Sequence, residues 1–437
     1  MTVFESTGCP LPVRIESRAA VDPPPACDAI VVGGGIIGLL IAIGLRERGR
    51  SVMVLEACNV GSAQSGRNMG FVREQGRDAV EAEAMRYSAS RWRALAERFG
   101  ARFGWTGGGH LSIARDEQSL AQVESWGGIA AGVGTRFEVV TGRAARDRWP
   151  WLAKDIAGVG YTPDDGHVDP ASAMRAIAGS ARELGVEIVE GAVVEEIERA
   201  AGRVEGVVLA DGRSVHAPLV VVAAGAWSGR LLSRVGVRLP LHMGRGTLSA
   251  TRPFRRITES SGWDVTGAGF RQAPDGRVVF GMGAFVDVDV RWEDLRSSFA
   301  LLPTLWQNRR TMRVRPGAQL ARDLGGLVTG RGLSPLDRTE PRANMRASDE
   351  GLQRLRELVP AFAELEVESV WAGVIDSTPD FLPIAGGTGI DGLLVVAGTS
   401  GHGLGIAPAL ADGVVAIAEG RDEADLIDAL SRQRFPS

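Results

Sequence analysis

A glycine-rich hexapeptide near the start of the chain is the first group of residues whose types and spacing point to chemistry. Residues 33–38, Gly-Gly-Gly-Ile-Ile-Gly, fit the pattern G-x-G-x-x-G. Gly33 permits a tight turn, Gly35 lets a pyrophosphate approach the backbone, and Gly38 lets the following helix pack closely on its strand. Helix-start N–H groups attract phosphates because they lack partners and carry partial positive charge. The motif therefore predicts a dinucleotide site.

An acidic residue follows these glycines at the distance that a dinucleotide site requires. Glu56 lies eighteen residues after Gly38, at the end of a predicted strand, and Ala57 follows it. A carboxylate there accepts hydrogen bonds from the ribose hydroxyl pair and repels a 2′-phosphate. The dinucleotide is therefore expected to be FAD or NAD rather than NADP.

A second glycine-rich run lies far along the chain, at residues 398–405, before a predicted apolar helix at 406–419. Glycines in such a turn let backbone N–H groups approach a flat ring closely. A helix start aimed at that ring would favour the negative charge of a reduced flavin. His402, inside the run, is interpreted as held for backbone geometry and hydrogen bonding rather than as a proton-transfer base.

Two groups of secondary-structure elements must position these glycine-rich turns. A buried strand at 29–32, a helix at 36–48 and a strand at 51–56 form a βαβ unit. We predict an α/β fold: a Rossmann-like FAD-binding domain with an inserted α+β substrate domain built on an antiparallel sheet. The predicted FAD-binding pieces are 28–90, 151–238 and 366–437, the substrate-binding pieces are 91–150 and 239–365, and residues 1–27 form a flexible arm.

Five segments in order resemble the FAD-dependent D-amino-acid oxidase, glycine oxidase and sarcosine oxidase family. Besides the two glycine runs, they are the loop 61–70, the run 165–170 (Asp-Gly-His-Val-Asp-Pro) and the run 223–228 (Ala-Ala-Gly-Ala-Trp-Ser). The run 378–383 and Val194 also match the family. The resemblance covers residues 28 to 420 and implies that FAD is contacted by Gly33, Gly35, Ile36, Ile37, Gly38, Glu56, Ala57, Ser65, Gly66, Arg67, Asn68, Met69, Gly70, Val194, Ala224, Gly225, Trp227, Gly373, Gly401, His402, Gly403, Leu404 and Gly405.

Departures from the family pattern refine this expectation. Several relatives attach the flavin to a cysteine where this chain has Gly373, or to a histidine in the loop 61–70, which has none here. The FAD is therefore expected to be noncovalent. Ile375 stands where many relatives have an arginine. Lys154 is the only lysine, so the lysine that activates oxygen in some relatives is missing and a dehydrogenase is favoured over an oxidase; the acceptor, oxygen or a carrier, stays open.

The resemblance implies hydride transfer from the carbon beside a substrate amine to flavin N5, giving an imine that hydrolyses. A substrate carboxylate needs a cation, for which arginine is best because it binds in a bidentate manner. Arg73, just after the flavin loop, and Arg271 are the candidates. Gln75 and Asp376 are candidate polar neighbours, and Asp376 either pairs with the amine or caps a turn.

Composition limits the partners. The formal net charge is -4 and the pI near 5.9, so neither nucleic acid nor an anionic membrane is expected as partner. The three cysteines and five histidines have no metal-like spacing, and no metal is predicted. The uncharged stretch 29–45 is interpreted as a strand and helix, not a membrane span. Without a signal-peptide pattern at the N-terminus, a cytoplasmic location is expected.

Three alternatives stay open. A hydroxy-acid or polyol-phosphate dehydrogenase could use the same fold, and a screen of amines against hydroxy acids separates it. An FAD-binding subunit of a multisubunit dehydrogenase would lack activity as an isolated chain. A flavin monooxygenase shares the first glycine motif, but its relatives carry Gly-Asp where this chain has residues 401–403 (Gly-His-Gly).

Overall fold

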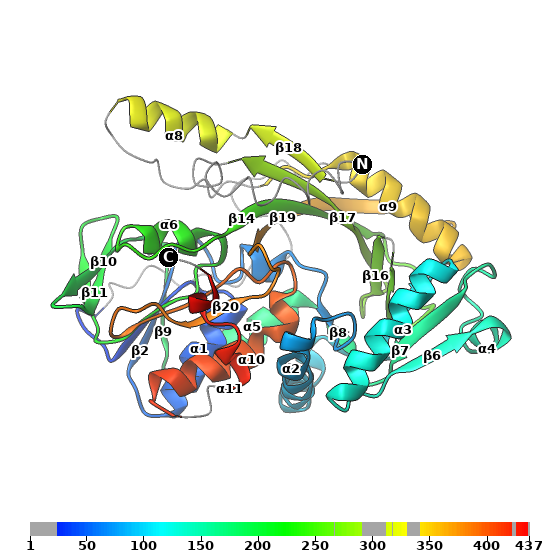
Figure 1. Ribbon diagram of the computed structural model, residues 1–437, viewed down its shortest axis with the longest axis horizontal. Coiled ribbons are helices and arrows are strands. Elements are labelled where there is room, and N and C mark those ends of the chain that lie inside the picture. The colour runs from blue at the N-terminus through cyan, green and yellow to red at the C-terminus, as the bar shows by residue number, and fades with distance from the viewer. Residues whose placement is uncertain are drawn as a thin grey trace.

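The computed structural model describes residues 24–265, 267–290, 312–316, 318–329, 341–421 and 425–435. Most of the predicted arm, residues 1–23, lies outside the described residues. The described chain builds one parallel sheet with its helices and one larger, mainly antiparallel sheet. In Figure 1 the long strands of the larger sheet lie above the first sheet and its helices. The predicted α/β class with a second antiparallel sheet is confirmed.

The first sheet has six strands in the order β20-β21-β13-β1-β2-β9. The strands are β20 (Ile384–Gly387), β21 (Leu393–Ala397), β13 (Val220–Val222), β1 (Ala29–Val32), β2 (Val52–Glu56) and β9 (Glu187–Glu190). All pairs are parallel except β20 with β21. The strands β1, β13 and β21 are uninterrupted apolar runs because both faces of this sheet are covered.

Alternate residues of β1 point into two different hydrophobic clusters. Ala29 and Val31 face the helices α1 (Ile36–Glu47), α5 (Pro170–Glu183), α10 (Gly403–Ala418) and α2 (Ala79–Phe99). Ile30 and Val32 face the opposite layer, formed by β10 (Val194–Ala200), β11 (Arg203–Leu209), β12 (Ser214–His216) and α6 (Ser228–Ser233). The period-2 pleat of the strand produces this division.

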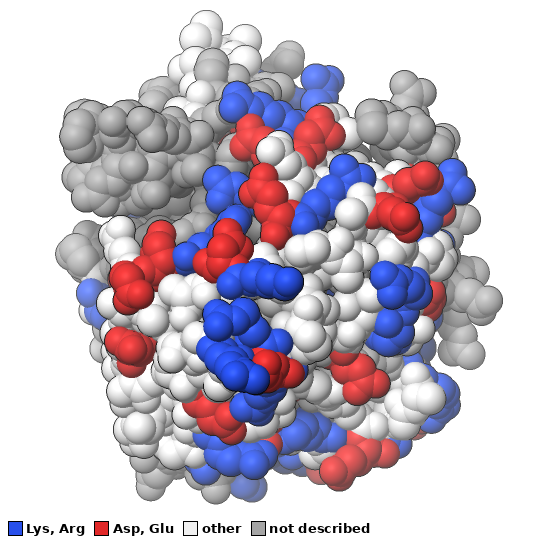
Figure 2. Space-filling view, turned by 90° about the vertical axis from the view of Figure 1, so that its right-hand side faces the viewer, with Lys and Arg blue, Asp and Glu red and all other residues white. Residues whose placement is uncertain are grey.

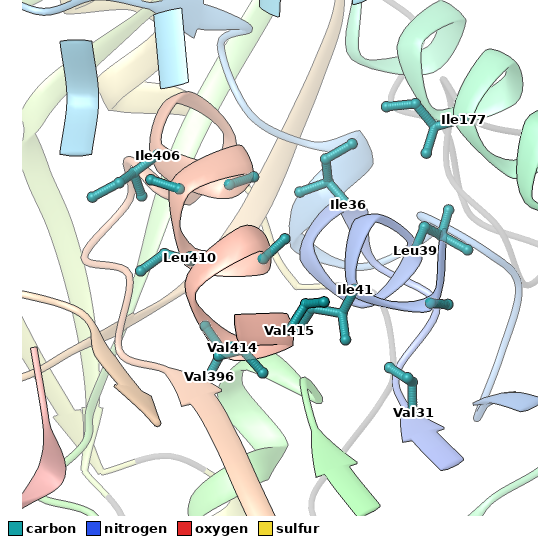
Figure 3. Packing of buried hydrophobic residues seen from close by; sticks show 14 of the residues in the cluster. Val31, Ile36, Leu39, Ile41, Ile177, Val396, Ile406, Leu410, Val414 and Val415 are labelled. Atoms are coloured by element: carbon teal, nitrogen blue, oxygen red, sulfur yellow. The ribbon is translucent and has the colours of Figure 1, made fainter. Parts of the chain in front are cut away.

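Helices α1 and α10 begin at the two glycine-rich runs and lie side by side. Figure 3 shows Ile41 of α1 next to Val415 of α10. A Cβ on Gly44 would lie 3.0 Å from Cγ2 of Val415, so the absent side chain lets the two helices approach. Close packing of these helices fixes the starts of both relative to the same sheet.

The second sheet has nine strands and holds the other wall of the site. Its path is β19-β14-β17-β16-β15-β5-β7-β6, and β18 pairs with β17. The strands are β19 (Val367–Ser377), β14 (His242–Thr251), β17 (Val278–Val290), β16 (Ala268–Gln272), β15 (Ser261–Asp264), β5 (His110–Ala114), β7 (Gly158–Thr162), β6 (Glu138–Thr141) and β18 (Met312–Pro316). Helix α9 (Met345–Leu358) packs on β17, and α3 (Glu117–Gly132) packs on β5 and β7.

Two predicted domain boundaries need correction. The pieces 151–238 and 366–437 were assigned to the FAD-binding domain, but β7 and β19 within them pair in the nine-stranded sheet. Strand β19 pairs with β14 over almost its whole length, so this part of the chain crosses from one sheet to the other. Asp376, near the end of β19, accepts a hydrogen bond from the N–H of Gly398, so this strand connects the nine-stranded sheet to the turn at residues 398–405.

The remaining elements connect these layers. A small sheet joins β3 (Phe71–Val72), β8 (Gly166–Val168) and β4 (Trp105–Gly107). The short helices are η1 (Gln64–Gly66), η2 (Gly100–Phe103), α4 (Gly142–Arg148), η3 (Gly225–Trp227), α8 (Ala318–Val328), η4 (Pro360–Phe362), α11 (Asp425–Asp428) and η5 (Arg432–Arg434). None of the described helices is long and apolar enough to cross a membrane.

The surface beside α3 and α4 mixes charges of both signs. Figure 2 shows arginines interspersed with acidic residues over this face. Several of them form exposed ion pairs, including Arg148 with Glu138 and Arg143 with Asp147. Such pairs contribute little to stability, but the mixing prevents a large field of one sign over the described part of this face.

Candidate active site

A single cavity of about 950 Å³ connects the two glycine-rich turns. It begins at the carboxyl ends of β1 and β2, passes the loop 62–71 and reaches the start of α10 and the nine-stranded sheet. Ligands of open α/β sheets bind outside the carboxyl ends of the strands. The volume lies near the upper end of the ~300–1,000 Å³ typical of small-molecule sites, so it suits one long ligand.

The first turn has no room for side chains. Gly33 has φ +113°, and a Cβ there would lie 2.5 Å from the carbonyl oxygen of Ala223. A Cβ on Gly38 would lie 2.1 Å from the carbonyl oxygen of Gly33. Gly35 caps α1 without a side-chain hydrogen bond, and the N–H of Ile36 donates to Ser65 Oγ at 2.9 Å. The turn is therefore built for backbone contact with a phosphate.

Glu56 stands beside this turn at the end of β2. Its Oε2 accepts from the N–H of Gly34 at 2.7 Å, and its Oε1 accepts from the N–H of Cys58 at 2.8 Å. These two bonds hold the carboxylate at the cavity wall, where Val194 and Trp227 also line it. The arrangement suits an adenosine, with the carboxylate at the ribose.

Asp376, the penultimate residue of β19, holds the second turn through hydrogen bonds. Its Oδ2 accepts from the N–H of Gly398 at 2.6 Å, and its Oδ1 accepts from Nε2 of Gln64 at 2.7 Å. The carbonyl of Asp376 also accepts from the N–H of Ser400 at 2.8 Å. These contacts are what the turn-capping alternative for Asp376 predicts, and they join the two FAD loops through Gln64.

His402 is the N-cap of α10 and lines the cavity, and its ring contacts Glu81 of α2. The His402 Nε2 to Glu81 Oε2 distance is 2.9 Å. Burial and the charge of Arg77 lower the pKa of His402, so the ring is neutral and Nε2–H donates to the carboxylate. Although burial opposes ionisation of Glu81, this hydrogen bond and Arg77 hold its pKa below the ordinary value. The pair fixes the ring, in agreement with the interpretation of His402 as a positioning residue.

Two buried arginines line the cavity just before α2. The guanidinium of Arg73 lies 4.2 Å from the ring centroid of Trp263, and its Nη1 donates weakly to the carbonyl of Gln75 at 3.4 Å. Arg77 Nη1 lies 3.8 Å from Glu81 Oε1. Burial and the nearby Arg77 lower the pKa of Arg73, yet arginine keeps its proton in proteins.

The positive charge of Arg73 is only partly balanced, by Glu81 and Asp165 at longer range. No carboxylate of the described residues forms an ion pair with it, whereas Glu81 is shared between Arg77 and His402. Burial and the neighbouring Glu74 raise the pKa of Asp165 well above its ordinary value, which favours the neutral acid. Because a buried charge is costly unless paired, Arg73 forms a site prepared for an anion.

The other two substrate candidates lie behind the cavity wall. Arg271 does not line the cavity: its Nε donates to the carbonyl of Met69 at 2.5 Å, and its Nη2 lies 3.7 Å from Asp169. Gln75 is buried and donates from Nε2 to the carbonyl of His110 at 2.8 Å. Both residues support the loop after the flavin motif, so the prediction that they contact the substrate is not favoured.

Most of the predicted cofactor residues line this one cavity. Gly38 and Gly66 are the two that do not, because Gly38 packs against the first turn and Gly66 is buried within η1. Sequence reasoning missed Gln64, Arg77, Glu81 and Trp263. Gln64 lies within the loop 61–70 and Arg77 lies shortly after it, but nothing in the sequence marks Glu81 or Trp263.

The fold and the cavity together define a dinucleotide-binding oxidoreductase of the Rossmann type. A family model described as FAD dependent oxidoreductase (DAO) matches residues 28–417. The chain therefore belongs to the DAO family of FAD-dependent oxidoreductases. The glycine turns without room for a Cβ, the Glu56 carboxylate at the cavity wall and the cavity that links the turns all fit FAD.

Similar proteins include amine and amino-acid enzymes. The chain is 32% identical over 224 residues to 4-methylaminobutanoate oxidase (formaldehyde-forming) of Paenarthrobacter nicotinovorans, which is 51% of this chain but only 27% of that protein. It is 26% identical over 391 residues to glycine oxidase of Bacillus licheniformis, covering 87% of this chain and 90% of that one. The solved L-amino acid deaminase from Proteus myxofaciens has the same fold, with a TM-score of 0.87, 22% identity and 97% and 96% of the two chains covered.

Proposed function

We propose that this protein oxidises the carbon–nitrogen bond of an amine that carries a carboxylate, using noncovalently bound FAD. The observation that carries the proposal is the buried Arg73, which lines the same cavity as the α10 turn and has no ion-pair partner among the described residues. FAD, when bound, accepts a hydride at N5, and water hydrolyses the resulting imine to a carbonyl.

The chain supplies position and electrostatics. Arg73 holds the carboxylate, and its stacking on Trp263 fixes the guanidinium plane, which orients the carbon that loses the hydride. The N-terminus of α10 faces the cavity through Gly403 and favours negative charge there. The two curated relatives described above act, by their names, on molecules with both an amine and a carboxylate.

Noncovalent binding and an electron carrier as acceptor are parts of the same proposal. Gly373 lines the cavity where some relatives carry a cysteine. Lys154, the only lysine, is exposed in a turn and does not line the cavity. No lysine is therefore available beside the site to assist oxygen, which supports a dehydrogenase.

Anaerobic bleaching of the visible flavin band tests the proposal. We expect bleaching by members of a panel of D- and L-amino acids and N-methyl amino acids, and none by hydroxy acids. Bleaching by hydroxy acids alone would establish the rival hydroxy-acid dehydrogenase. Activity of the isolated chain with an artificial acceptor would argue against the alternative of a subunit that works only in a complex.

A matched pair of arginine variants tests the site. Arg73→Gln should lower kcat/KM on the order of 100-fold or more, because a buried charge pair with the substrate is lost, while FAD content stays unchanged. Arg143→Gln, whose side chain is 87% exposed in α4, is the control and should leave both values unchanged. Equal activity of the two variants would show that Arg73 does not hold the carboxylate.

A further inference from the structure

Five glycines of the nine-stranded sheet line the cavity, among larger side chains such as Trp263, Met282 and Val286. These glycines are Gly246, Gly269, Gly281, Gly283 and Gly373. They are neighbours on adjacent strands, since Gly269 pairs with Gly281 and Gly246 pairs with Gly373. At these positions no side chain enters the cavity, which Arg73 and Trp263 also line.

Packing explains some of these glycines but not Gly283. A Cβ on Gly281 would lie 2.4 Å from Leu248, so that position requires glycine. A Cβ on Gly283 would meet nothing among the described residues closer than the carbonyl oxygen of Gly267 at 3.9 Å and Trp263 at 4.0 Å. The backbone of Gly283 is also not left-handed. Among the described residues, neither strain nor crowding accounts for the missing side chain.

Gly283 lies in an irregularity of β17 that faces the cavity. On β14, Leu248 pairs with Gly281 and Gly246 pairs with Val286, so β17 has extra residues between the two pairs. Bulges of this kind are common beside active sites because they redirect the strand and its side chains.

The described side chains that β14, β15 and β17 add to this wall are uncharged. They are Thr247, Leu248, Trp263, Met282 and Val286. Trp263 lines the cavity and also stacks against the guanidinium of Arg73. A group anchored at Arg73 therefore extends along an aromatic face into an apolar space.

We propose that this glycine-lined chamber selects amino acids with a bulky apolar side chain, and that Gly283 determines the size limit. The inference rests on the proposed function, since it takes Arg73 as the anchor of the substrate carboxylate. Charged side chains are excluded because they would lose water without finding a partner. Small side chains are accepted less well because they leave the apolar wall uncovered.

Filling the chamber tests the inference. Gly283→Leu should lower the ratio of kcat/KM for phenylalanine over alanine on the order of 100-fold, the range that shape changes in an apolar pocket produce, in whichever enantiomer the protein accepts. Gly283→Ala should lower it less, and serves if the leucine variant does not fold. Gly128→Leu is the control, because Gly128 lies exposed on α3 with nothing within 4 Å of a Cβ.

A binding measurement separates this inference from the proposed function. In the wild-type holoenzyme, 3-phenylpropanoate should perturb the flavin spectrum at a lower concentration than acetate, and Gly283→Leu should reverse that order. If phenylpropanoate binds as expected but no amino acid bleaches the flavin, the proposed function is wrong, but the inference of an apolar chamber is supported. A wild-type preference for alanine, glutamate or lysine, or a ratio that Gly283→Leu leaves unchanged, would overturn the chamber.

Discussion

The two ends of the cavity are lined by different kinds of groups. At the nucleotide end, the wall is the backbone of contiguous turns, with Gly33 and Gly38 packed against carbonyl oxygens and Glu56 bound to two N–H groups. At the substrate end, the wall combines side chains from distant segments, such as Arg73 stacked on Trp263. Short contiguous motifs can hold a ligand that is common to a whole family. A substrate that differs between relatives requires binding residues that can be substituted independently.

The largest effect is expected where the nucleotide end has least room. Gly38→Val should abolish FAD binding, because a Cβ would lie 2.1 Å from the carbonyl oxygen of Gly33 and must displace the start of α1. Overpacking of this kind costs roughly 1–3 kcal/mol or more in stability as well. Flavin absorbance per chain and the Tm measure both. Gly179→Ala in α5, which meets nothing within 4 Å, is the control and should keep its flavin.

A smaller effect is expected from the carboxylate beside the same turn. Glu56→Gln keeps the shape but removes the charge that accepts from Gly34, Cys58 and the ribose. The Kd for FAD should rise about 10- to 100-fold, since bonds to a charged group contribute about 1.5–3 kcal/mol. Calorimetric titration of the apoprotein measures it. An unchanged Kd would mean that the backbone alone holds the adenosine half.

The contact between α2 and α10 should add a pH-dependent share of stability. The pKa of Glu81 is held below its ordinary value in the folded protein, so its stabilisation is present above the unfolded value of about 4.3 and is lost as pH falls further. Glu81→Gln should cost about 1–3 kcal/mol at pH 7, and less at acidic pH. Urea unfolding at several pH values measures this. A cost that does not change with pH would contradict the assignment.

The smallest effect is expected for the only lysine. Lys154→Gln should leave the rate of flavin reoxidation by oxygen unchanged, because Lys154 is exposed and lies outside the cavity lining. Stopped-flow reoxidation measures this rate. A clear decrease would mean that the chain has an oxygen-activating lysine after all, and the preference for a dehydrogenase would be wrong.

The sequence identifies residues that line the nucleotide end because the requirements of that end are local. The glycine spacing and the position of Glu56 follow from one βαβ unit, and most of the residues proposed from it line the cavity. Contacts between residues far apart in the sequence could not be predicted in the same way. Glu81 contacts His402 although 321 positions separate them, and nothing in the run around Glu81 marks that contact.

The same limit applies at the substrate end, where the sequence does not show which side chains line the cavity. Arg271 has a suitable residue type, but the pairing of β16 places it beneath Met69, where it supports a loop. The glycine-lined chamber depends on register, because Gly246, Gly281 and Gly283 come together only when β14 and β17 pair with an irregularity. Glycine counts alone do not show which glycines share a wall.

A crystal structure of the FAD-loaded protein tests the central claim most directly. One FAD should occupy the cavity, with its pyrophosphate at residues 33–38 and its ring system at residues 401–405, and with Arg73 open on the substrate side. Two separate ligand sites, or a flavin ring far from the start of α10, would contradict the account.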